Sequence, residues 1–591
     1  MKTKLFLFTI LFGTLIISNA QENKFQSKSR PLDFEYLSAP DSLGIRHQLK
    51  TPNTNNKNSL TGDIKIPYPI IFIHGLDSHS ETWTPTTDFM DSNFNFTYGG
   101  RLDFNLNYDN SNSTSNKLFY PLPGADIAQW FPNPSYWING DYYYLNFAVG
   151  SDGSYNPLNI SPLNVLSNEA AIAKQGVALS RAIQQVMNIT GRDKVILFGH
   201  SMGGLAAREY LQNPSNWTEP NINHHVAKLI TTGTPHGGYT GSNFSLATGI
   251  NSSSEAYRDL RTEYSNSNSG VFLSGGIEST LNIGSSYHNN DINCNGINND
   301  GILIQGLNFK SLPTSTVDFA YIMGNCTNCV VSQGQFLGDG IVRLVNANLS
   351  NFQTLPSPKN EFIYTASAVV EIHSVLPEQT YENMQGLDEP NEYNLAYGIE
   401  LGKIYKGFIT VQPVGGYTND WDDYKFAIQG NGNQILTISN SSSNSLAVRI
   451  YNSSIQQQGQ VYSVPTGTSQ FSFPLIAGQY FLEINGTPTS TSYLYPYTFT
   501  LSSSLSNPDF TSLNSLKIYP NPTTSKVFFD NTNSNFNDVV IYNYLGQEVG
   551  KSKFSESLNN QEINLSKFAS GVYVLRFSNQ ESSQSVKIIK E

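Results

Sequence analysis

The sequence predicts an α/β domain built on a mostly parallel sheet with helices on both faces, followed by two all-β sandwich domains. Between residues 66 and 395, apolar strand-like runs alternate with helical patterns, which is typical of a parallel α/β sheet. From residue 396 onward the apolar residues alternate with polar ones, and Asn, Gly and Ser interrupt them, as in β-sandwiches. A chain of 591 residues is also too long for one hydrophobic core.

The first twenty residues read MKTKLFLFTILFGTLIISNA. Two lysines, an apolar run from Leu5 to Ile17 and a small-residue end at Ala20 are typical of a secretory signal peptide. The run is short for a membrane anchor, and no later stretch is long and apolar enough to span a bilayer. We therefore expect an exported protein whose mature form has no transmembrane segment, with residues 21–65 as an N-terminal extension.

Charge and cysteine content narrow the classes of partner. The net charge is −12 and no basic block interrupts it, so neither nucleic acid nor an anionic membrane surface is expected as a partner. The three cysteines are Cys294, Cys326 and Cys329. A single C-x-x-C offers too few ligands for a metal site. We expect a local disulfide at most, and the pairing stays open.

The α/β region contains five strand-like runs and one clear helix. The runs are YPIIFIHG, DYYYLNFAV, KVILFGHS, VAKLITTGTP and VDFAYIMGN. The helix is SNEAAIAKQGVALSRAIQQVMNIT, residues 167–190, whose apolar residues recur every three to four positions. Ser167 is its expected N-cap.

A nucleophile is predicted where the third of these runs ends. Gly199-His200-Ser201-Met202-Gly203 fits G-x-S-x-G, with a strand before it and the helix-like GLAAREYLQ after it. A bare G-x-S-x-G is a weak signal because Gly and Ser are common in turns. The strand-turn-helix context makes it specific, because it places the Ser201 hydroxyl on a tight turn at the edge of the sheet.

A serine nucleophile of this kind needs an acid and then a histidine later in the chain. Asp339, between two glycines in GQFLGDGIVRLVNANL, is the expected acid, and Asp318 and Asp300 are weaker alternatives. His373 is the one histidine that follows Asp339, and it is the expected base. His236 precedes the acid, so we assign it a structural role. In this scheme His373 takes the Ser201 proton and Asp339 orients the imidazole.

Residues 66–395 resemble an α/β-hydrolase of the lipase and esterase kind. The resemblance is carried by His74-Gly75-Leu76, the GHSMGG motif, TTGTPHGG at Thr231–Gly238, and the GDGIV segment around Asp339. It implies that the N–H groups of Leu76 and Met202 form the oxyanion hole, with His74 supporting the loop from below.

A Ser-, Asn- and Gly-rich insertion, residues 239–316, interrupts the α/β pattern. In lipase-like enzymes such insertions cover the nucleophile. Within it, Asp291, Asn293 and Asn295 are spaced like the start of an EF-hand calcium loop, but Ile302 stands where the bidentate Glu would be. Structural Ca²⁺ and ordinary turn chemistry both remain open here, and no cofactor is expected to be required.

The region 396–505 resembles, loosely, the pre-peptidase C-terminal domain that accompanies many secreted hydrolases. The runs DDYKFAIQ, QILTISN, LAVRIYN and AGQYFLEING carry the resemblance. It implies an accessory or binding module. Asp422 and Asp423 could contribute to a calcium site, but we interpret them as exposed acidic turn residues.

Residues 515–591 closely resemble the type A sorting domain of the type IX secretion system. YPNP at Tyr519–Pro522, LGQEV, and the L-x(5)-G-x-Y-x-L pattern at Leu565–Leu575 carry the resemblance. It implies that the secretion machinery is a partner. It also implies passage through the periplasm and outer membrane, ending in a secreted or surface-attached protein.

These observations together predict a secreted serine hydrolase that cleaves carboxylic esters, either lipids or polymer-linked groups, through an acyl-enzyme. Within the same fold, an esterase acting on polysaccharide side groups or polyester, or an amidase or peptidase using the same triad, are the alternatives. A surface glycan-binding protein or adhesin is the alternative outside enzymes.

Overall fold

The structure is a computed structural model. It describes residues 64–106, 129–131, 137–149, 167–239, 255–260, 271–277, 303–329, 337–356, 359–410, 419–487, 494–504, 518–529, 536–554, 561–579 and 583–591. The chain divides into two compact units, residues 1–504 and 505–591. The predicted signal peptide and almost all of the predicted extension lie outside the described residues.

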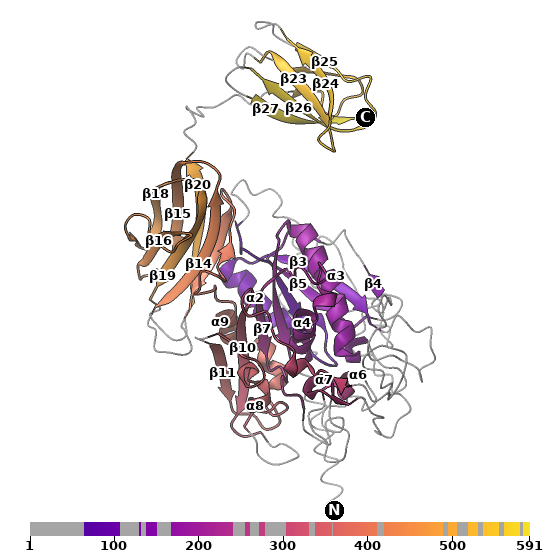
Figure 1. Cartoon of the computed structure of the whole chain (residues 1–591), viewed down its shortest axis with the longest axis vertical. Coiled ribbons are helices and arrows are strands. Elements are labelled where there is room, and N and C mark those ends of the chain that lie inside the picture. The colour runs from indigo at the N-terminus through magenta and orange to yellow at the C-terminus, as the bar shows by residue number, and fades with distance from the viewer. Residues whose placement is uncertain are drawn as a thin grey trace, which may run out of the picture. The chain divides into compact units, whose positions relative to one another are not determined.

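The first unit contains an eight-stranded sheet with the order β11-β10-β7-β6-β2-β5-β3-β4 (Figure 1). All neighbouring strands are parallel except β3 and β4, which are antiparallel. Five of the strands are the predicted runs. The strand bounds are β2 Ile70–Ile73, β3 Tyr98–Asn105, β4 Gln129–Phe131, β5 Tyr142–Asn146, β6 Val195–His200, β7 Val226–Thr232, β10 Asp318–Cys326 and β11 Asn360–Ala366.

Helices cover both faces of this sheet, as the alternation of strands and helices predicts. Residues of α3 and α4 pack on one face with Ile71 and Ile73 of β2, whereas α2 and α9 pack on the other with Ile70 and Phe72. β2 is buried on both sides because consecutive side chains of a strand point to opposite faces. The described α-helices are α2 Thr84–Phe94, α3 Ile172–Thr190, α4 Met202–Gln212, α6 Glu255–Asp259, α7 Val271–Ser274, α8 Leu344–Ala347 and α9 Thr380–Gly386.

The start of α3 differs from the prediction. Ser167 lies in a 3-10 turn (Ser167–Glu169), and its Oγ accepts the Leu106 N–H at 2.8 Å instead of capping the helix. The helix begins at Ile172, and Asp259 from α6 accepts the Ile172 N–H at 3.0 Å. Glu255 accepts the preceding N–H at 2.9 Å. A helix N-terminus favours such acidic acceptors, and here the insertion supplies them from more than eighty residues away.

The first unit also contains a sandwich of two five-stranded sheets, β1-β13-β20-β15-β18 and β12-β14-β19-β16-β17. β1 comes from before the α/β sheet in the chain, yet it pairs in parallel with β13. The predicted extension therefore ends as an edge strand of the sandwich. The bounds are β1 Ile64–Lys65, β12 Tyr397–Gly398, β13 Ile404–Ile409, β14 Asp420–Ile428, β15 Gly432–Asn440, β16 Leu446–Asn452, β17 Tyr462–Val464, β18 Gly467–Leu475, β19 Gly478–Gly486 and β20 Tyr495–Ser504.

A buried ion pair joins the sandwich to the α/β sheet. Lys406 of β13 lies 2.9 Å from the Asp141 carboxylate, which stands just before β5. Asp141 also accepts the N–H groups of Ile66 and Thr97. Lys406 is 5% exposed and Asp141 1%. Around the pair, one continuous apolar cluster contains side chains of both sheets, so the sandwich is packed against the α/β sheet rather than tethered to it.

The second unit is a smaller all-β domain with sheets β21-β22-β25 and β24-β23-β26-β27 around its own apolar core. An antiparallel β-ribbon of β8 and β9 belongs to the insertion in the first unit. Among the described residues, no helix has the length and apolar composition needed to cross a bilayer. The bounds are β8 Gly276–Ile277, β9 Leu303–Ile304, β21 Ile518–Tyr519, β22 Lys526–Phe529, β23 Asp538–Asn543, β24 Glu548–Lys553, β25 Gln561–Asn564, β26 Gly571–Ser578 and β27 Ser583–Lys590.

Lys406→Met should destabilise the first unit strongly, because it leaves the Asp141 carboxylate buried without its cation. Loss of one partner of a buried pair costs about 3–5 kcal/mol. Lys526→Met is the matched control, since Lys526 and Glu562 form a largely exposed pair in the second unit, worth about 1 kcal/mol or less. Urea unfolding of both variants measures the difference. Equal, small losses would show that the buried pair does not hold the two sheets together.

Candidate active site

Ser201 stands between β6 and α4 in a strained backbone conformation, with φ 52° and ψ −127°. A positive φ is unfavourable for a residue with a Cβ, so the surrounding packing must hold it. A Cβ on Gly199 would lie 2.4 Å from the Gly204 nitrogen, and one on Gly203 would lie 2.5 Å from the His74 oxygen. The glycines therefore allow the strand, the helix and the β2 loop to meet at this turn, as the motif predicts.

The three predicted residues form one hydrogen-bonded chain. The His373 Nε2 lies 2.9 Å from the Ser201 Oγ, and its Nδ1 lies 2.7 Å from the Asp339 Oδ2. His373 begins a 3-10 helix, His373–Glu378, and is 7% exposed. Residues separated by more than 170 positions in the chain are thus brought within hydrogen-bonding distance.

The loop that carries Asp339 fixes the direction of its carboxylate. The second oxygen, Oδ1, accepts the N–H groups of Ile341 at 2.9 Å and Val342 at 2.6 Å. The Asp339 backbone oxygen accepts the Ile372 N–H at 2.7 Å, which ties the acid loop to the residue before His373. Asp339 is fully buried, so the carboxylate acts on the imidazole with little screening.

Electrostatics around His373 favour a basic imidazole. Burial alone would lower the pKa of His373, but the charge and hydrogen bond of Asp339 outweigh it and raise this pKa above that of a free histidine. His200, directly before Ser201, hydrogen-bonds through its Nε2 to the His373 backbone oxygen at 3.0 Å. Burial holds the pKa of His200 well below its usual range, so this ring stays neutral and positions His373 without adding charge.

The loop after β2 lies against the turn that carries Ser201. His74 accepts the Phe147 N–H on Nε2 at 2.9 Å, so its Nδ1 donates to the Gly75 oxygen at 2.8 Å. Burial lowers the pKa of His74 to about 4. His74 thus braces the loop, as we expected from the sequence. Within the described part of the chain, the N–H groups of Leu76 and Met202, the expected oxyanion-hole donors, have no backbone acceptor.

The other candidates lie elsewhere. His236 is buried between Arg208 and Thr231 and makes no contact with the Ser201 hydroxyl, in keeping with a structural role. Asp318 is the first residue of β10, whereas Asp339 packs against Gly324 near the other end of that strand. The Asp318 Oδ2 lies 2.8 Å from the Lys228 Nζ. Asp300, and the predicted calcium ligands Asp291, Asn293 and Asn295, lie outside the described residues.

Described parts of the insertion pack beside the nucleophile. Met202, next to Ser201, and Leu76 belong to one apolar cluster with residues of α6 and α7. The cluster members are Ile172, Met202, Leu205, Ala256, Leu260, Phe272, Leu273 and Leu307. The insertion therefore shares a buried apolar core with the residue that follows Ser201.

Our interpretation of Asp422 and Asp423 as exposed turn residues is wrong. Both lie on β14 and are buried, at 0% and 2% exposure. Asp422, Asp388 and Glu389 bring ligand oxygens within 4.8 Å of one another. One buried oxygen on Asp422 and one on Glu389 have no hydrogen-bond partner in the described chain. Burial, reinforced by Asp420, raises the pKa of Glu389 to about 8. Such a set fits a hard cation such as Ca²⁺.

A disulfide joins Cys326, at the end of β10, to Cys329, which settles the pairing that the sequence left open for these two residues. Cys294 lies outside the described residues. The Cys326 N–H donates to the Gly338 oxygen at 2.6 Å. The bridged turn therefore lies directly against the loop that carries Asp339.

Sequence reasoning missed three elements of the site. It gave no role to His200, to the helix-capping pair Glu255 and Asp259, or to Asp388 and Glu389. His200 occupies the variable position of G-x-S-x-G, so the motif carries no signal for it. The acidic residues became recognisable only through their partners in space, which no spacing in the chain indicates.

Two families match parts of the chain. Residues 165–288 match the PGAP1-like alpha/beta domain, and residues 517–591 match the secretion system C-terminal sorting domain. No curated protein matches the chain.

Several solved structures are similar in fold. A gene product of Listeria innocua is 14% identical, with 55% of this chain and 95% of that one covered and a TM-score of 0.29. A lipase-esterase related protein of Clostridium acetobutylicum is 11% identical, with 53% and 91% covered and a TM-score of 0.24. The pre-peptidase C-terminal domain of a Bacillus anthracis collagenase is 18% identical, with 20% and 99% covered and a TM-score of 0.16.

The family matches confirm two predictions. The chain has an α/β-hydrolase-like domain with a mostly parallel sheet, followed by all-β sheets. It also has a type IX sorting domain, so it is exported by that machinery to the cell surface or the exterior.

Proposed function

Starting from an exported α/β-hydrolase domain, we propose that this protein hydrolyses carboxylic esters, with Ser201 as nucleophile, His373 as base and Asp339 as acid. The observation that carries the proposal is the continuous hydrogen-bonded chain from the Ser201 Oγ through the His373 ring to Asp339, with distances of 2.9 and 2.7 Å. A serine hydroxyl is a weak nucleophile until an oriented base takes its proton, and this chain supplies that base.

The reaction begins when the Ser201 Oγ attacks the ester carbonyl carbon while the His373 Nε2 takes its proton. The carbonyl oxygen becomes an oxyanion, which the N–H groups of Leu76 and Met202 stabilise. The intermediate collapses, the carbon–oxygen bond to the alcohol breaks, and His373 returns the proton to the leaving alkoxide. Water then attacks the acyl-enzyme with His373 as base, which releases the carboxylic acid and restores Ser201.

The Leu76 side chain, which is only partly buried, supports an apolar acyl group. Leu76 and Met202 stand next to the reacting atoms and continue into the cluster with Leu260 and Phe272. An acyl chain packed on the exposed part of Leu76 would gain roughly 0.8 kcal/mol for each methylene buried. A charged acyl group would lose hydration without gaining a partner. The site therefore supports lipid-like or other apolar esters.

Ser201→Ala should abolish turnover while leaving the protein folded. Removing the nucleophile of a Ser-His-Asp triad lowers kcat by about 10⁶. Hydrolysis of p-nitrophenyl esters from acetyl to palmitoyl by the mature chain measures this loss and the acyl preference. Thermal unfolding of the variant controls for folding. Ester hydrolysis that survives Ser201→Ala would place the chemistry elsewhere.

The pH profile should report the raised pKa of His373. The imidazole must be neutral to take the Ser201 proton, so kcat/KM should fall as pH drops through a pKa above the usual ~6.5. Asp339→Asn removes the charge that raises this pKa, so the acid limb should move to lower pH. The same change should lower kcat by about 10⁴, because the imidazole loses its required tautomer. An unchanged acid limb would contradict this role of Asp339.

We also propose that Asp388, Glu389 and Asp422 hold a structural Ca²⁺ between the linker after α9 and β14. The cation would neutralise the buried carboxylates. It would also be coordinated by the two oxygens of Glu389 and Asp422 that have no hydrogen-bond partner in the described chain. The catalytic steps do not involve it.

Ca²⁺ at about 100 times its Kd should therefore stabilise the EDTA-treated protein by about 2.7 kcal/mol. Thermal unfolding with and without Ca²⁺ measures this as a rise in Tm. Asp422→Asn should remove the rise, while Asp193→Asn, which changes an exposed carboxylate, should keep it. A Tm indifferent to Ca²⁺ in the unmodified protein would refute the site.

A further inference from the structure

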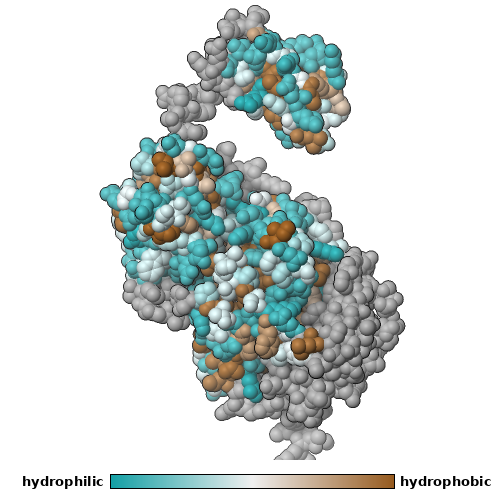
Figure 2. All heavy atoms as spheres, in the orientation of Figure 1, coloured by the Kyte–Doolittle hydropathy of each residue, from teal (hydrophilic) through white to brown (hydrophobic). Residues whose placement is uncertain are grey.

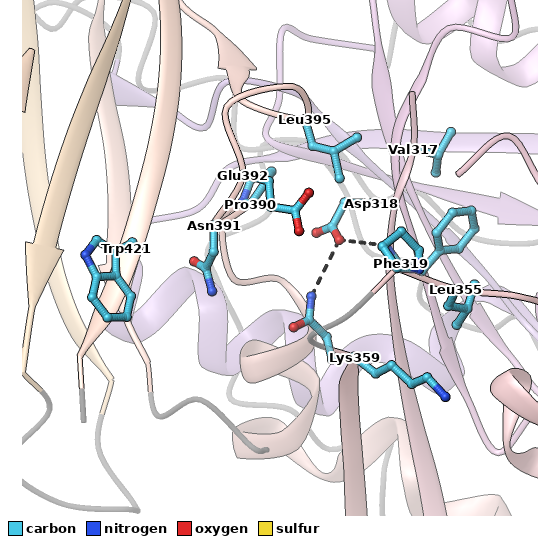
Figure 3. A pocket seen from close by; sticks show the side chains of 12 residues that line it. Val317, Asp318, Phe319, Leu355, Lys359, Pro390, Asn391, Glu392, Leu395 and Trp421 are labelled. Carbon is cyan, nitrogen blue, oxygen red and sulfur yellow. Dashed lines mark hydrogen bonds between the residues drawn. The ribbon is translucent and has the colours of Figure 1, made fainter. Parts of the chain in front are cut away.

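A cavity of about 230 Å³ lies between the α/β sheet and the sandwich. Figure 3 shows its walls: the start of β10 on one side, Trp421 of β14 on the other, and linker residues between them. The Asp423 N–H donates to the Pro390 oxygen at 3.0 Å, which fastens the linker to β14. The lining residues are Val317, Asp318, Phe319, Leu355, Pro356, Lys359, Asn360, Pro390, Asn391, Glu392, Leu395 and Trp421.

This cavity is separate from the candidate active site. Asp318 is the first residue of β10, whereas Asp339 packs against Gly324, six residues further along the strand. At a rise of roughly 3.3 Å for each residue, the two places are about 20 Å apart. Ser201 stands at the carboxyl end of β6, whereas the cavity lies at the amino ends of β10 and β11. A molecule bound here would not reach the Ser201 hydroxyl.

One side of the cavity offers preorganised hydrogen-bond acceptors. The fully buried Lys228 lies 2.8 Å from the Asp318 Oδ2, and the Asp318 Oδ1 accepts the Phe319 N–H at 2.7 Å and the Asn360 Nδ2 at 3.5 Å, so the carboxylate is held in place. The carboxylates of Asp318 and Glu392 point toward one another in Figure 3. The buried Oδ1 of Asn391 has no hydrogen-bond partner among the described residues. A buried acceptor without a donor is costly, so these groups favour a ligand that brings several O–H or N–H groups.

The opposite side is apolar and aromatic. The indole of Trp421 provides a flat wall and the side chains of Pro390 and Leu395 provide hydrophobic edges, whereas Leu355 lies beside Phe319 on the β10 side in Figure 3. An indole face is a large rigid surface that packs against flat apolar groups. A few fixed polar groups facing an apolar wall are typical of small-molecule sites.

The composition excludes several ligand classes. Anions such as phosphate would meet two carboxylates, and Lys359 extends away from these in Figure 3. An acyl chain would leave the acceptors without donors. Neither Asp318 nor Glu392 belongs to a group of metal-ligating side chains within the described chain. The volume of about 230 Å³ is enough for one sugar ring.

We propose that this cavity binds one neutral pyranose, as a free sugar or as a residue of a polysaccharide. Sugar hydroxyls donate to Asp318, Glu392 and the Asn391 oxygen. The C–H face of the ring packs on Trp421. The site anchors the exported hydrolase to glycan independently of ester cleavage, so it stands whether or not Ser201 proves to be the nucleophile.

The test uses the mature full chain carrying Ser201→Ala, so that no hydrolysis alters the probes. Methyl glycosides of glucose, galactose, mannose, xylose and N-acetylglucosamine are titrated by calorimetry. Soluble xylan, galactomannan and mixed-linkage glucan are tested by affinity electrophoresis. We expect at least one glycoside to bind, and Trp421→Ala and Glu392→Gln each to weaken its binding at least tenfold. Binding of a matching polysaccharide would identify a polymer-bound source, and binding of the glycoside alone a free sugar; both support the site.

Phe309→Ala, which removes an exposed aromatic ring outside the cavity, is the matched control and should leave sugar binding unchanged. Glu392→Gln keeps the shape of the side chain, so it tests the site even where Trp421→Ala impairs folding. The proposal is overturned if no sugar binds, or if affinity survives Glu392→Gln and Trp421→Ala. It is also overturned if only amines such as ethanolamine bind. Ester hydrolysis by the unmodified chain is measured separately, so failure of one proposal does not obscure the other.

Discussion

The close approach of three backbone segments at the end of β6 is the constraint on which the candidate site depends. The positive φ of Ser201 turns the chain sharply from strand into helix, and it persists only because Gly199 and Gly203 let neighbouring backbone come nearer than a Cβ would allow. The same approach brings the loop after β2 against the serine, where a Cβ on Gly75 would lie 2.8 Å from the Ser201 Cβ. The nucleophile and the loop after β2 are thus positioned by one packing arrangement.

The remaining parts of the site are held by contacts between distant segments. Asp339 reaches His373 because its loop is fastened to Ile372 by a backbone hydrogen bond and to β10 beside the Cys326–Cys329 bridge. His200 holds the His373 backbone from below without carrying charge. The acidic residues of α6 dock the insertion on the N-terminus of α3, which places apolar side chains beside Met202. Hydrogen bonds at the buried ends of helices and loops therefore hold the apolar parts of the insertion and the α/β sheet together.

The sandwich and the α/β sheet form one compact unit, and buried carboxylates from both lie where the two meet. Asp141 is balanced by Lys406, and Asp318 by Lys228. Glu389 and Asp422 each have one buried oxygen without a hydrogen-bond partner in the described chain, and burial and neighbouring carboxylates raise the pKa of both. The junction thus combines paired charges that hold the fold with a cavity lined by Asp318, Glu392 and Trp421. Figure 2 shows that the described surface on this face of the first unit is largely hydrophilic.

The sequence alone determined the fold class and the three residues that meet in the site, because both follow from local patterns. Apolar runs identified β2, β5, β6, β7 and β10, and the strand-turn-helix context with the order Ser201, Asp339, His373 needed no distances. β3 and β11 were missed because their polar residues obscure the apolar pattern, and Ser167 was misassigned because its hydroxyl found the Leu106 N–H instead. Only the tertiary structure decided the burial of Asp422 and Asp423, the capping of α3 by the insertion, and the cavity at Trp421. Each depends on segments far apart in the chain, and the free energy of a buried charge is set by neighbours in space, which the order of residues does not specify.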